Sequence, residues 1–382
     1  MTKMKLQDKT VLEFDLSEGM FHVIEPSLLP IRIRDGITDI NPNNMDYKSF
    51  VKNYEALTNF FRGRSLNIKR RHAKKILNAL HISQSNDNDT VMKIMIVCKA
   101  LSVTDDYWIT NDDSERWDKV NVRTNPLHET LSQIALTGSS PLTVTGKVHT
   151  PELTGQGAYA KAWMREDDGL YLYKASTVNG NESAIEAEVS NILDYTNVPH
   201  VHYELMFLNN LEVCRCKNMC NDSFSIVPAG DISSWCSRAG IKFDDYVVGT
   251  DPENFYKTVV VDYLVSNSDR HINNWGFYMN NKNGNIESMH PLFDHNNAFD
   301  PGDMASKDGG ESMMMPGLSK KEAAELAIKS CHFKINEPIP LSVFIDRSHE
   351  DSFMERASSL GLLPQSRGSD KVFVAGKTDK GR

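Results

Sequence analysis

The stretch NSDRHINNWGF, residues 267–277, is the part of the sequence that decides how the chain is interpreted. It follows a predicted helix and leads into a predicted β-hairpin at residues 276–294, whose turn carries Asn-Gly, a strong hairpin signal. Asp269 and Asn274 are five residues apart within it, and Asp294 follows the hairpin after an apolar run. Because a hairpin folds the chain back, we expect Asn274 and Asp294 to meet at its open end.

These three polar residues match the needs of phosphoryl transfer. In protein kinases a carboxylate takes the proton of the acceptor hydroxyl, and an Asn and a second Asp hold Mg²⁺, with the first pair spaced as D-x-x-x-x-N. Asp269, Asn274 and Asp294 fill the three positions. A loop rich in Asn is also typical of ordinary turns and caps. The complete string DRHxxN, with LFD after an Asn-Gly hairpin, favours the kinase interpretation.

The same strings carry a resemblance to known families. DRHINN with the later LFD resembles the catalytic loop of HipA-like Ser/Thr protein kinases, and DRHxxN is also similar to the phosphoinositide kinases. The resemblance implies that Asp269 is the catalytic base and that Asn274 and Asp294 are Mg²⁺ ligands, with ATP as the phosphoryl donor. It covers roughly residues 142–362. It implies an α+β, bilobal protein-kinase-like fold with a small β-rich lobe and a larger helical lobe.

A kinase also needs a lysine on a central strand and an acidic partner on the next helix. Lys174 lies in the strand pattern GLYLYKAS, and a helix is expected over residues 182–195. Glu186 and Glu188 flank the apolar stripe of that helix on opposite sides, so periodicity does not choose between them. The spacing from Glu186 to Ser190 resembles the HipA-like pattern, which makes Glu186 the first choice.

A loop over the phosphates is expected before Lys174. Gly155 and Gly157 lie in TGQG, and two close glycines allow backbone N–H groups to approach phosphate oxygens. An ordinary hairpin turn is the alternative, but the position of the loop favours phosphate binding. Lys161 is a competing lysine for the phosphates. It follows the loop closely, and we interpret it as a surface residue of a strand.

The chain divides into four predicted segments. A length of 382 residues fits two or three domains of about 100–200 residues each. A β-rich N-terminal subdomain is usual in HipA toxins but is not expected here, so the antitoxin contact of those toxins is not carried over. The segments are a mainly helical N-terminal region with a linker (1–140), a kinase-like N-lobe (141–228), a helical C-lobe (229–364) and a polar tail (365–382).

The composition indicates a globular protein with an acidic balance. Asp and Glu total 51 against 42 Lys and Arg, which gives a net charge of −9 and argues against a nucleic-acid coat or a membrane-surface protein. The N-terminus is charged, and no apolar run approaches the ~20 residues of a membrane span. We therefore expect a cytoplasmic protein without membrane contact.

Seven basic residues gather between Arg62 and Lys75, with no acidic residue among them. On a helix, most of these side chains would point outward while Ile68, Ala73 and Ile76 point inward. We interpret the run as a solvated helix face rather than a nucleic-acid patch, and we do not expect direct contact with nucleic acid.

Together these features predict a Ser/Thr protein kinase that transfers the γ-phosphoryl group of ATP to a protein hydroxyl with Mg²⁺. The enzymatic alternative is a phosphoinositide-type lipid kinase, but residues 301–316 carry only Lys307 against three acidic residues, which favours a protein substrate. The non-enzymatic alternative is a regulator with a kinase-like fold that binds DNA or protein. An antitoxin-like or regulatory protein partner stays open, as does a place in a toxin–antitoxin system.

Overall fold

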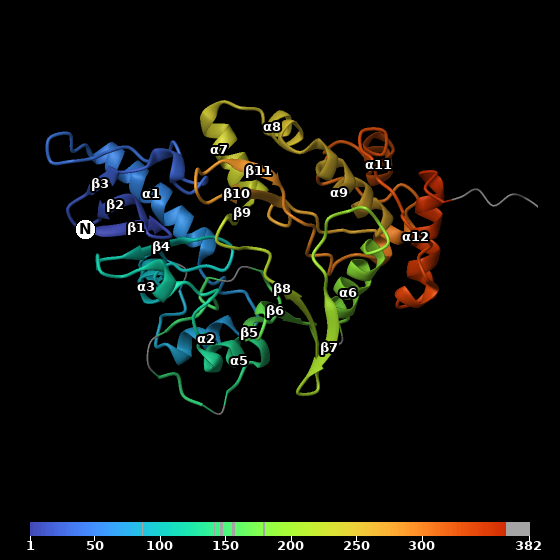
Figure 1. The fold of residues 1–382 in the computed structure, drawn as a ribbon, viewed down its shortest axis with the longest axis horizontal. Helices are drawn as coiled ribbons and strands as arrows, with labels where there is room; N and C mark the ends of the chain where they lie inside the picture. Colours follow the sequence, from blue (N-terminus) through green and yellow to red (C-terminus); the bar gives the residue numbers. More distant parts are fainter. Residues whose placement is uncertain (86, 141, 146–147, 155–156, 179, 364–382) are drawn as a thin grey trace, which may run out of the picture.

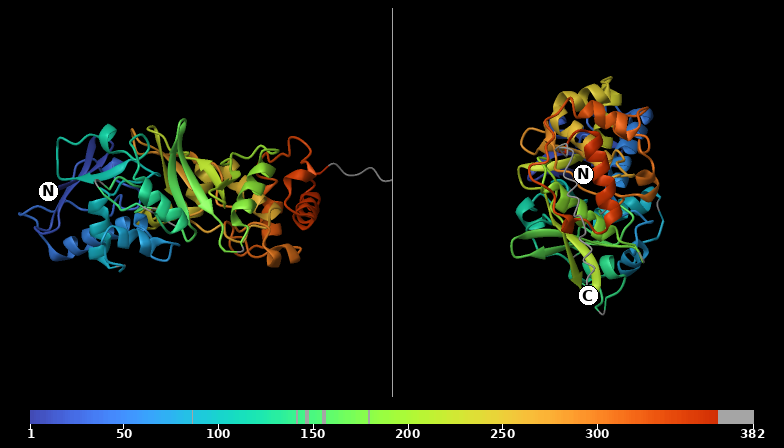
Figure 2. Two further views of the ribbon diagram at one scale, coloured as in Figure 1. Left: turned by 90° about the horizontal axis from the view of Figure 1, so that it is seen from below. Right: turned by 90° about the vertical axis from the view of Figure 1, so that its right-hand side faces the viewer.

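The computed structural model describes residues 1–85, 87–140, 142–145, 148–154, 157–178 and 180–363 (Figure 1). The predicted tail, 365–382, lies outside the described residues. The N-terminus lies at one end of the long axis and the last described helix at the other (Figure 2). Within the described part of the chain, every helix is too short or too polar to cross a lipid bilayer.

The N-terminal region contains a four-stranded antiparallel sheet beside its helices. The strand order is β3-β2-β1-β4. The elements are β1 (Thr2–Leu6), β2 (Lys9–Asp15), β3 (Met20–Val23), a 3₁₀ turn (Pro26–Leu28), α1 (Tyr47–Arg64), α2 (Ala73–Ala79), α3 (Asn88–Val97), β4 (Tyr107–Thr110), α4 (Trp117–Val120) and α5 (Glu129–Thr137). The prediction of a mainly helical region therefore missed this sheet. Strand β4 reaches β1 from far along the chain, and no local pattern reveals such a pairing.

The next segment folds into a small lobe around an antiparallel sheet. The strand order is β5-β6-β8-β7, and α6 packs against the sheet. The elements are β5 (Lys161–Glu166), β6 (Gly169–Ala175), α6 (Glu182–Leu193), β7 (Glu204–Leu208) and β8 (Leu211–Lys217). The predicted strand around Lys174 and the helix predicted over residues 182–195 are confirmed as β6 and α6. The β-favouring run at residues 142–149 also predicts a strand from the sequence, but its described residues form none.

The last segment is mostly helical and includes a three-stranded sheet in the order β11-β10-β9 (Figure 1). The S-x-x-E spacing from Ser319 to Glu322 predicts a capping box, which is confirmed because the side chains of Ser319 and Glu322 each bond the backbone of the other residue. The elements are β9 (Phe224–Pro228), α7 (Ala229–Ala239), α8 (Phe243–Thr250), α9 (Pro252–Leu264), β10 (Gly276–Asn280), β11 (Ile286–Met289), α10 (Pro301–Ala305), α11 (Lys320–Ala327), a 3₁₀ turn (Leu341–Val343) and α12 (Arg347–Ser359).

The basic run between Arg62 and Lys75 is not one helix. α1 ends at Arg64, and α2 begins at Ala73 after His72, whose φ of 67° interrupts the helical backbone. Lys75 is exposed, as the predicted solvated face requires. Arg70 is only 3% exposed, so the prediction is wrong for this residue. A long-range partner, which helical periodicity does not report, explains its burial.

That partner is Glu152. The Arg70 guanidinium donates to Glu152 Oε2 at 2.7 Å, and the other carboxylate oxygen accepts the backbone N–H of Trp163 on β5 at 2.8 Å. Burial raises the pKa of Glu152, and the Arg70 charge opposes that shift. The pair therefore ties the segment before α2 to the first strand of the small lobe.

We predict that Arg70→Ala lowers the free energy of unfolding by about 3–5 kcal/mol, because it leaves the buried Glu152 without its counter-charge. Lys74→Ala, an exposed neighbour in the same basic run, should stay within about 0.5 kcal/mol of the wild type. Urea denaturation followed by circular dichroism measures both. Equal stabilities of the two variants would contradict the assigned role of Arg70.

Candidate active site

Lys174 occupies the centre of the candidate site. It lies on β6 between β5 and β8, where its cross-strand neighbours are Lys161 and Cys214. Its ammonium group donates to Glu186 Oε2 at 2.9 Å and to Asp294 Oδ1 at 2.7 Å. The structure thus brings together three of the residues singled out from the sequence. They come from strand β6, helix α6 and the segment after the β10–β11 hairpin.

Glu186 joins two parts of the molecule through its two carboxylate oxygens. One oxygen accepts from Lys174, and the other accepts the backbone N–H of His295 at 3.0 Å. Its side chain is 1% exposed. Glu188, which the helix periodicity left as an alternative, turns toward α12 and bonds Nδ1 of His349 at 2.8 Å. The lysine partner in the structure is therefore Glu186.

The opposite charges of Lys174 and its two carboxylate partners stabilise one another. Burial works against the charge of Lys174, yet Asp294 and Glu186 outweigh it and hold the lysine pKa well above its ordinary value. Burial likewise opposes ionisation of Asp294, but Lys174 brings the pKa of that carboxyl down to about 2. The ring of Tyr203 lies 5.2 Å from the Lys174 ammonium. At neutral pH the site therefore holds a lysine cation between two carboxylates.

Asp269 and Asn274 lie in one loop that closes on itself. The Asn274 side-chain amide donates to the backbone carbonyl of Asp269 at 2.8 Å. The Asp269 carboxylate accepts from the Asn297 amide at 3.1 Å. Asn274 is 5% exposed, whereas Asp269 is only partly buried. The loop thus fixes the amide inside and leaves the carboxylate within reach of an incoming molecule.

Arg270 fastens this loop to the segment that carries Asp294. It is 2% exposed, and one of its terminal nitrogens donates to the carbonyls of Asn274 at 2.8 Å and Phe293 at 2.9 Å. Its Nε donates to the carboxylate of Asp262 on α9 at 3.1 Å. Sequence reasoning missed both Arg270 and Asp262. The available signal was the one acidic residue inside the apolar run of the preceding helix.

The oxygen atoms here suit a Mg²⁺ ion. Asn274 Oδ1 and Asp294 Oδ2 accept no hydrogen bond from any residue that the structure describes. Mg²⁺ takes carboxylate, carbonyl and water oxygens, and it favours carboxylates that are already ionised. The low pKa of Asp294 meets that condition. The donor set therefore fits the ion that the sequence predicts.

Of the two glycines of the predicted phosphate loop, Gly155 lies outside the described residues. Gly157 has a φ of 98°, a conformation that favours glycine, and a Cβ there would lie 2.7 Å from the Lys161 ammonium nitrogen. Lys161 thus packs against the loop residue.

Lys161 does not behave as the predicted surface residue. The register of the β5–β6 hairpin sets it directly opposite Lys174, so the two side chains share one face of the sheet. Burial lowers its pKa to about 7, and Arg70 and Lys174 add to the shift. The Asp167-Asp168-Gly169 turn, which fixes that register, is the signal that could have placed Lys161 in the cleft.

A small pocket opens beside these residues. Lys174 and Glu186 line it together with Tyr159, Cys214 and Asn296. Its lining joins the small lobe to the segment after Asp294.

The comparisons with known proteins give structural likeness only. No family model and no curated protein matches the sequence. The structure of the Shewanella oneidensis MR-1 toxin–antitoxin system HipA, HipB and operator DNA matches 97% of this chain and 92% of its own, at 11% identity and a TM-score of 0.53. The Helicobacter pylori proinflammatory kinase CtkA matches 53% of this chain and 90% of its own, at 14% identity and a TM-score of 0.39.

The chain has a HipA-like fold. The predicted α+β, kinase-like fold class is therefore confirmed. Because the HipA match spans 97% of the chain, the likeness extends over the N-terminal region, where a departure from HipA was expected. The four-stranded sheet described above lies in that region.

The contact between Glu188 and His349 predicts a pH-dependent stability. Burial opposes the His349 charge, but Glu188 raises the pKa of this imidazole above its ordinary 6.5. A raised pKa in the folded state stabilises the protein at pH values below 6.5, and the gain is lost as the pH rises through the folded value. His349→Gln should therefore destabilise the protein more at pH 5.5 than at pH 9, as measured by urea denaturation at both pH values.

The matched control is His332→Gln. His332 also lies beside a carboxylate, Glu253 at 3.2 Å, but its side chain is 89% exposed. Its substitution should cost little at either pH, because an exposed ion pair contributes little. A loss for His349→Gln that is the same at both pH values would contradict the role given to the Glu188 contact.

Proposed function

We propose that this chain is an ATP-dependent kinase that transfers the γ-phosphoryl group to a Ser or Thr hydroxyl of a protein, with Mg²⁺. The observation that carries the proposal is the double ion pair of Lys174 with Glu186 and Asp294. Its two contacts measure 2.9 and 2.7 Å and join the two lobes at a pocket. The HipA-like fold supports the same assignment.

The cationic side of the cleft would bind the triphosphate. Lys174 is proposed to hold the α- and β-phosphates, with Glu186 as its positioning residue. Backbone N–H groups of the Gly155–Gly157 loop are proposed to cover the phosphates. Lys161, beside Gly157 and opposite Lys174, would add a second side-chain nitrogen donor on the same face. Together these groups would supply donors for the phosphate oxygens.

Asn274 and Asp294 are proposed to hold the metal. When bound, Mg²⁺ would neutralise the charge on the β- and γ-phosphates. Arg270 serves this pair indirectly, because its bonds to the carbonyls of Asn274 and Phe293 keep the two ligand-bearing segments adjacent. Lys174, which already contacts Asp294, would keep the carboxylate ionised and oriented.

Asp269 is proposed as the catalytic base. The hydroxyl oxygen of the acceptor forms a bond to the γ-phosphorus, the bond from that phosphorus to the β–γ bridging oxygen breaks, and ADP leaves. The hydroxyl proton passes to the Asp269 carboxylate. The side chain is partly exposed, and its one hydrogen bond among the described residues comes from the Asn297 amide. An acceptor hydroxyl can therefore approach its other oxygen.

A protein substrate is favoured by the charge of the segment near the site. In the stretch 301–316, the side chain of Asp303 is buried against Lys320 and Arg356. Asp308 and Glu311 are exposed, with Lys307 as their basic counterpart. Anionic lipid headgroups attract basic surfaces, so this acidic stretch favours a protein acceptor.

A regulatory protein partner is part of the proposal. The Shewanella HipA structure is described as a complex with HipB and operator DNA. We propose that this chain likewise binds an antitoxin-like or regulatory protein, and that any contact with DNA is made through that partner rather than directly. The net charge of −9 supports the second point.

The test is incubation of the pure protein with γ-labelled ATP and Mg²⁺, alone and with a cell lysate, followed by separate counting of protein and lipid. We predict Mg²⁺-dependent label on Ser or Thr of protein. Label in the lipid fraction would instead indicate a lipid kinase. Nucleotide binding without any transfer would indicate a non-catalytic regulator.

The matched variant in the same assay is Asp269→Asn. It should reduce turnover by at least about a hundredfold while ATP affinity, measured by calorimetry, stays near that of the wild type, because a base acts on the acceptor rather than on the nucleotide. Asp351→Asn, at an exposed position of α12, serves as the control and should keep full turnover. A parallel loss of affinity and turnover in Asp269→Asn would contradict the role of base.

A further inference from the structure

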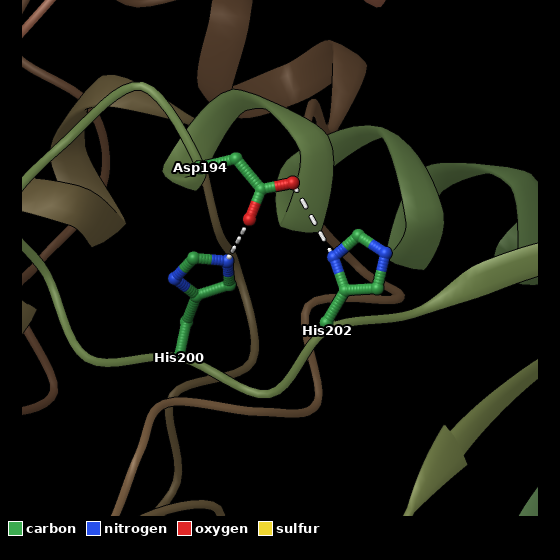
Figure 3. A group of neighbouring side chains, drawn as sticks. All are labelled: Asp194, His200 and His202. Atoms are coloured by element: carbon green, nitrogen blue, oxygen red, sulfur yellow. Dashed lines mark hydrogen bonds and ion pairs between the residues drawn. The ribbon is translucent and has the colours of Figure 1, made fainter.

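Three side chains with metal-ligating atoms gather at the end of α6 (Figure 3). Asp194 directly follows the last residue of the helix, and His200 and His202 lie in the segment that leads into β7. One carboxylate oxygen of Asp194 lies 3.0 Å from His200 Nε2, and the other lies 3.3 Å from His202 Nδ1. One ligand atom from each residue lies within 4.8 Å of the others.

The hydrogen bonds of His200 point to a cation at this place. Its Nδ1 lies 2.9 Å from the backbone carbonyl oxygen of Val198, which only accepts, so Nδ1 must carry a proton. In a neutral ring Nε2 then has a lone pair, yet it faces the acceptor oxygen of Asp194 at 3.0 Å. Two lone pairs do not approach so closely without a positive charge between them. Either a second proton or a metal ion meets this need.

We propose that Asp194, His200 and His202 bind a transition-metal ion of the zinc class. Two imidazole nitrogens and one carboxylate oxygen form a set that Zn²⁺ accepts, with water at the fourth position, whereas Mg²⁺ and Ca²⁺ prefer oxygen alone. Bonds of about 2.0–2.2 Å in a tetrahedron separate neighbouring ligand atoms by about 3.3–3.6 Å. The two imidazole nitrogens lie 3.0 and 3.3 Å from different oxygens of the Asp194 carboxylate, so a small side-chain adjustment would bring one oxygen and both nitrogens to that separation.

The surroundings of His200 fit a metal ligand. Metal-bound histidines commonly donate their second ring N–H to a backbone carbonyl, which fixes the ring and presents the other nitrogen. The Val198 carbonyl already does this for His200. The His200 side chain is 11% exposed, while Asp194 and His202 are 46% and 54% exposed and leave a path from solvent.

An ion at this position would fasten two segments that carry residues of the candidate active site. Asp194 ends the helix that bears Glu186. The segment around His200 pairs with Leu292, and the N–H of Val201 donates to the Leu292 carbonyl at 2.8 Å. Leu292 precedes Asp294 by two residues. The inference concerns ion binding and does not depend on the proposed kinase activity.

The test is equilibrium dialysis of the full chain, without an affinity tag, against Zn²⁺ in the presence of excess Mg²⁺, with metal content measured by mass spectrometry. We expect one zinc per chain. His202→Gln and Asp194→Asn, both at exposed positions, should weaken zinc binding by more than about tenfold. Loss of a residue that only hydrogen-bonds a metal ligand already costs about 10–100-fold in metal affinity, so loss of a ligand itself should cost at least as much. Excess Mg²⁺ keeps zinc from the Asn274 and Asp294 oxygens.

The control is His332→Gln, which removes an exposed histidine that also faces a carboxylate. It should bind zinc as the wild type does. Cobalt replacement adds an independent readout, because a tetrahedral nitrogen and oxygen site gives visible absorption that should disappear in His202→Gln. Zinc binding that survives both His202→Gln and Asp194→Asn, or a wild type that retains no zinc, would overturn the proposal.

Discussion

The ammonium group of Lys174 is the point on which the site depends. A charge that is 12% exposed needs close counter-charges to offset its lost hydration, and among the described residues Glu186 and Asp294 provide them at 2.9 and 2.7 Å. These partners belong to different parts of the chain, so satisfying one charge fixes a strand, a helix and the segment after β11 relative to one another. The backbone N–H of His295, bonded to Glu186, completes the connection.

Other buried cations extend this principle. Arg270 joins α9 to both ligand-bearing segments through Asp262 and two backbone carbonyls. Arg70 joins the N-terminal region to β5 through Glu152. Each of these arginines is nearly inaccessible to solvent and bonded to a carboxylate that is distant in sequence or on another element. Buried charged residues therefore lie where segments of the chain meet. Their contacts hold the segments that carry the cleft residues in place.

Local sequence was sufficient for some features and not for others. The loop that carries Asp269 and Asn274 and the β10–β11 hairpin that leads from it to Asp294 follow from short-range spacing and turn chemistry. Both could therefore be predicted. Glu186 and Glu188 are equivalent on a helical wheel, and only the packing of α6 between β6 and α12 separates them. Lys161 looked exposed because its position depends on strand register with β6. Arg70 looked solvated because its partner is distant in sequence.

The most direct test of the central claim is a crystal structure of the protein with Mn²⁺ and a non-hydrolysable ATP analogue. The account predicts an anomalous peak bonded to side-chain oxygens of Asn274 and Asp294, with Lys174 within hydrogen-bond distance of the α- or β-phosphate and still paired with Glu186. A nucleotide that binds elsewhere, or a Mn²⁺ ion that Asp294 does not contact, would contradict it.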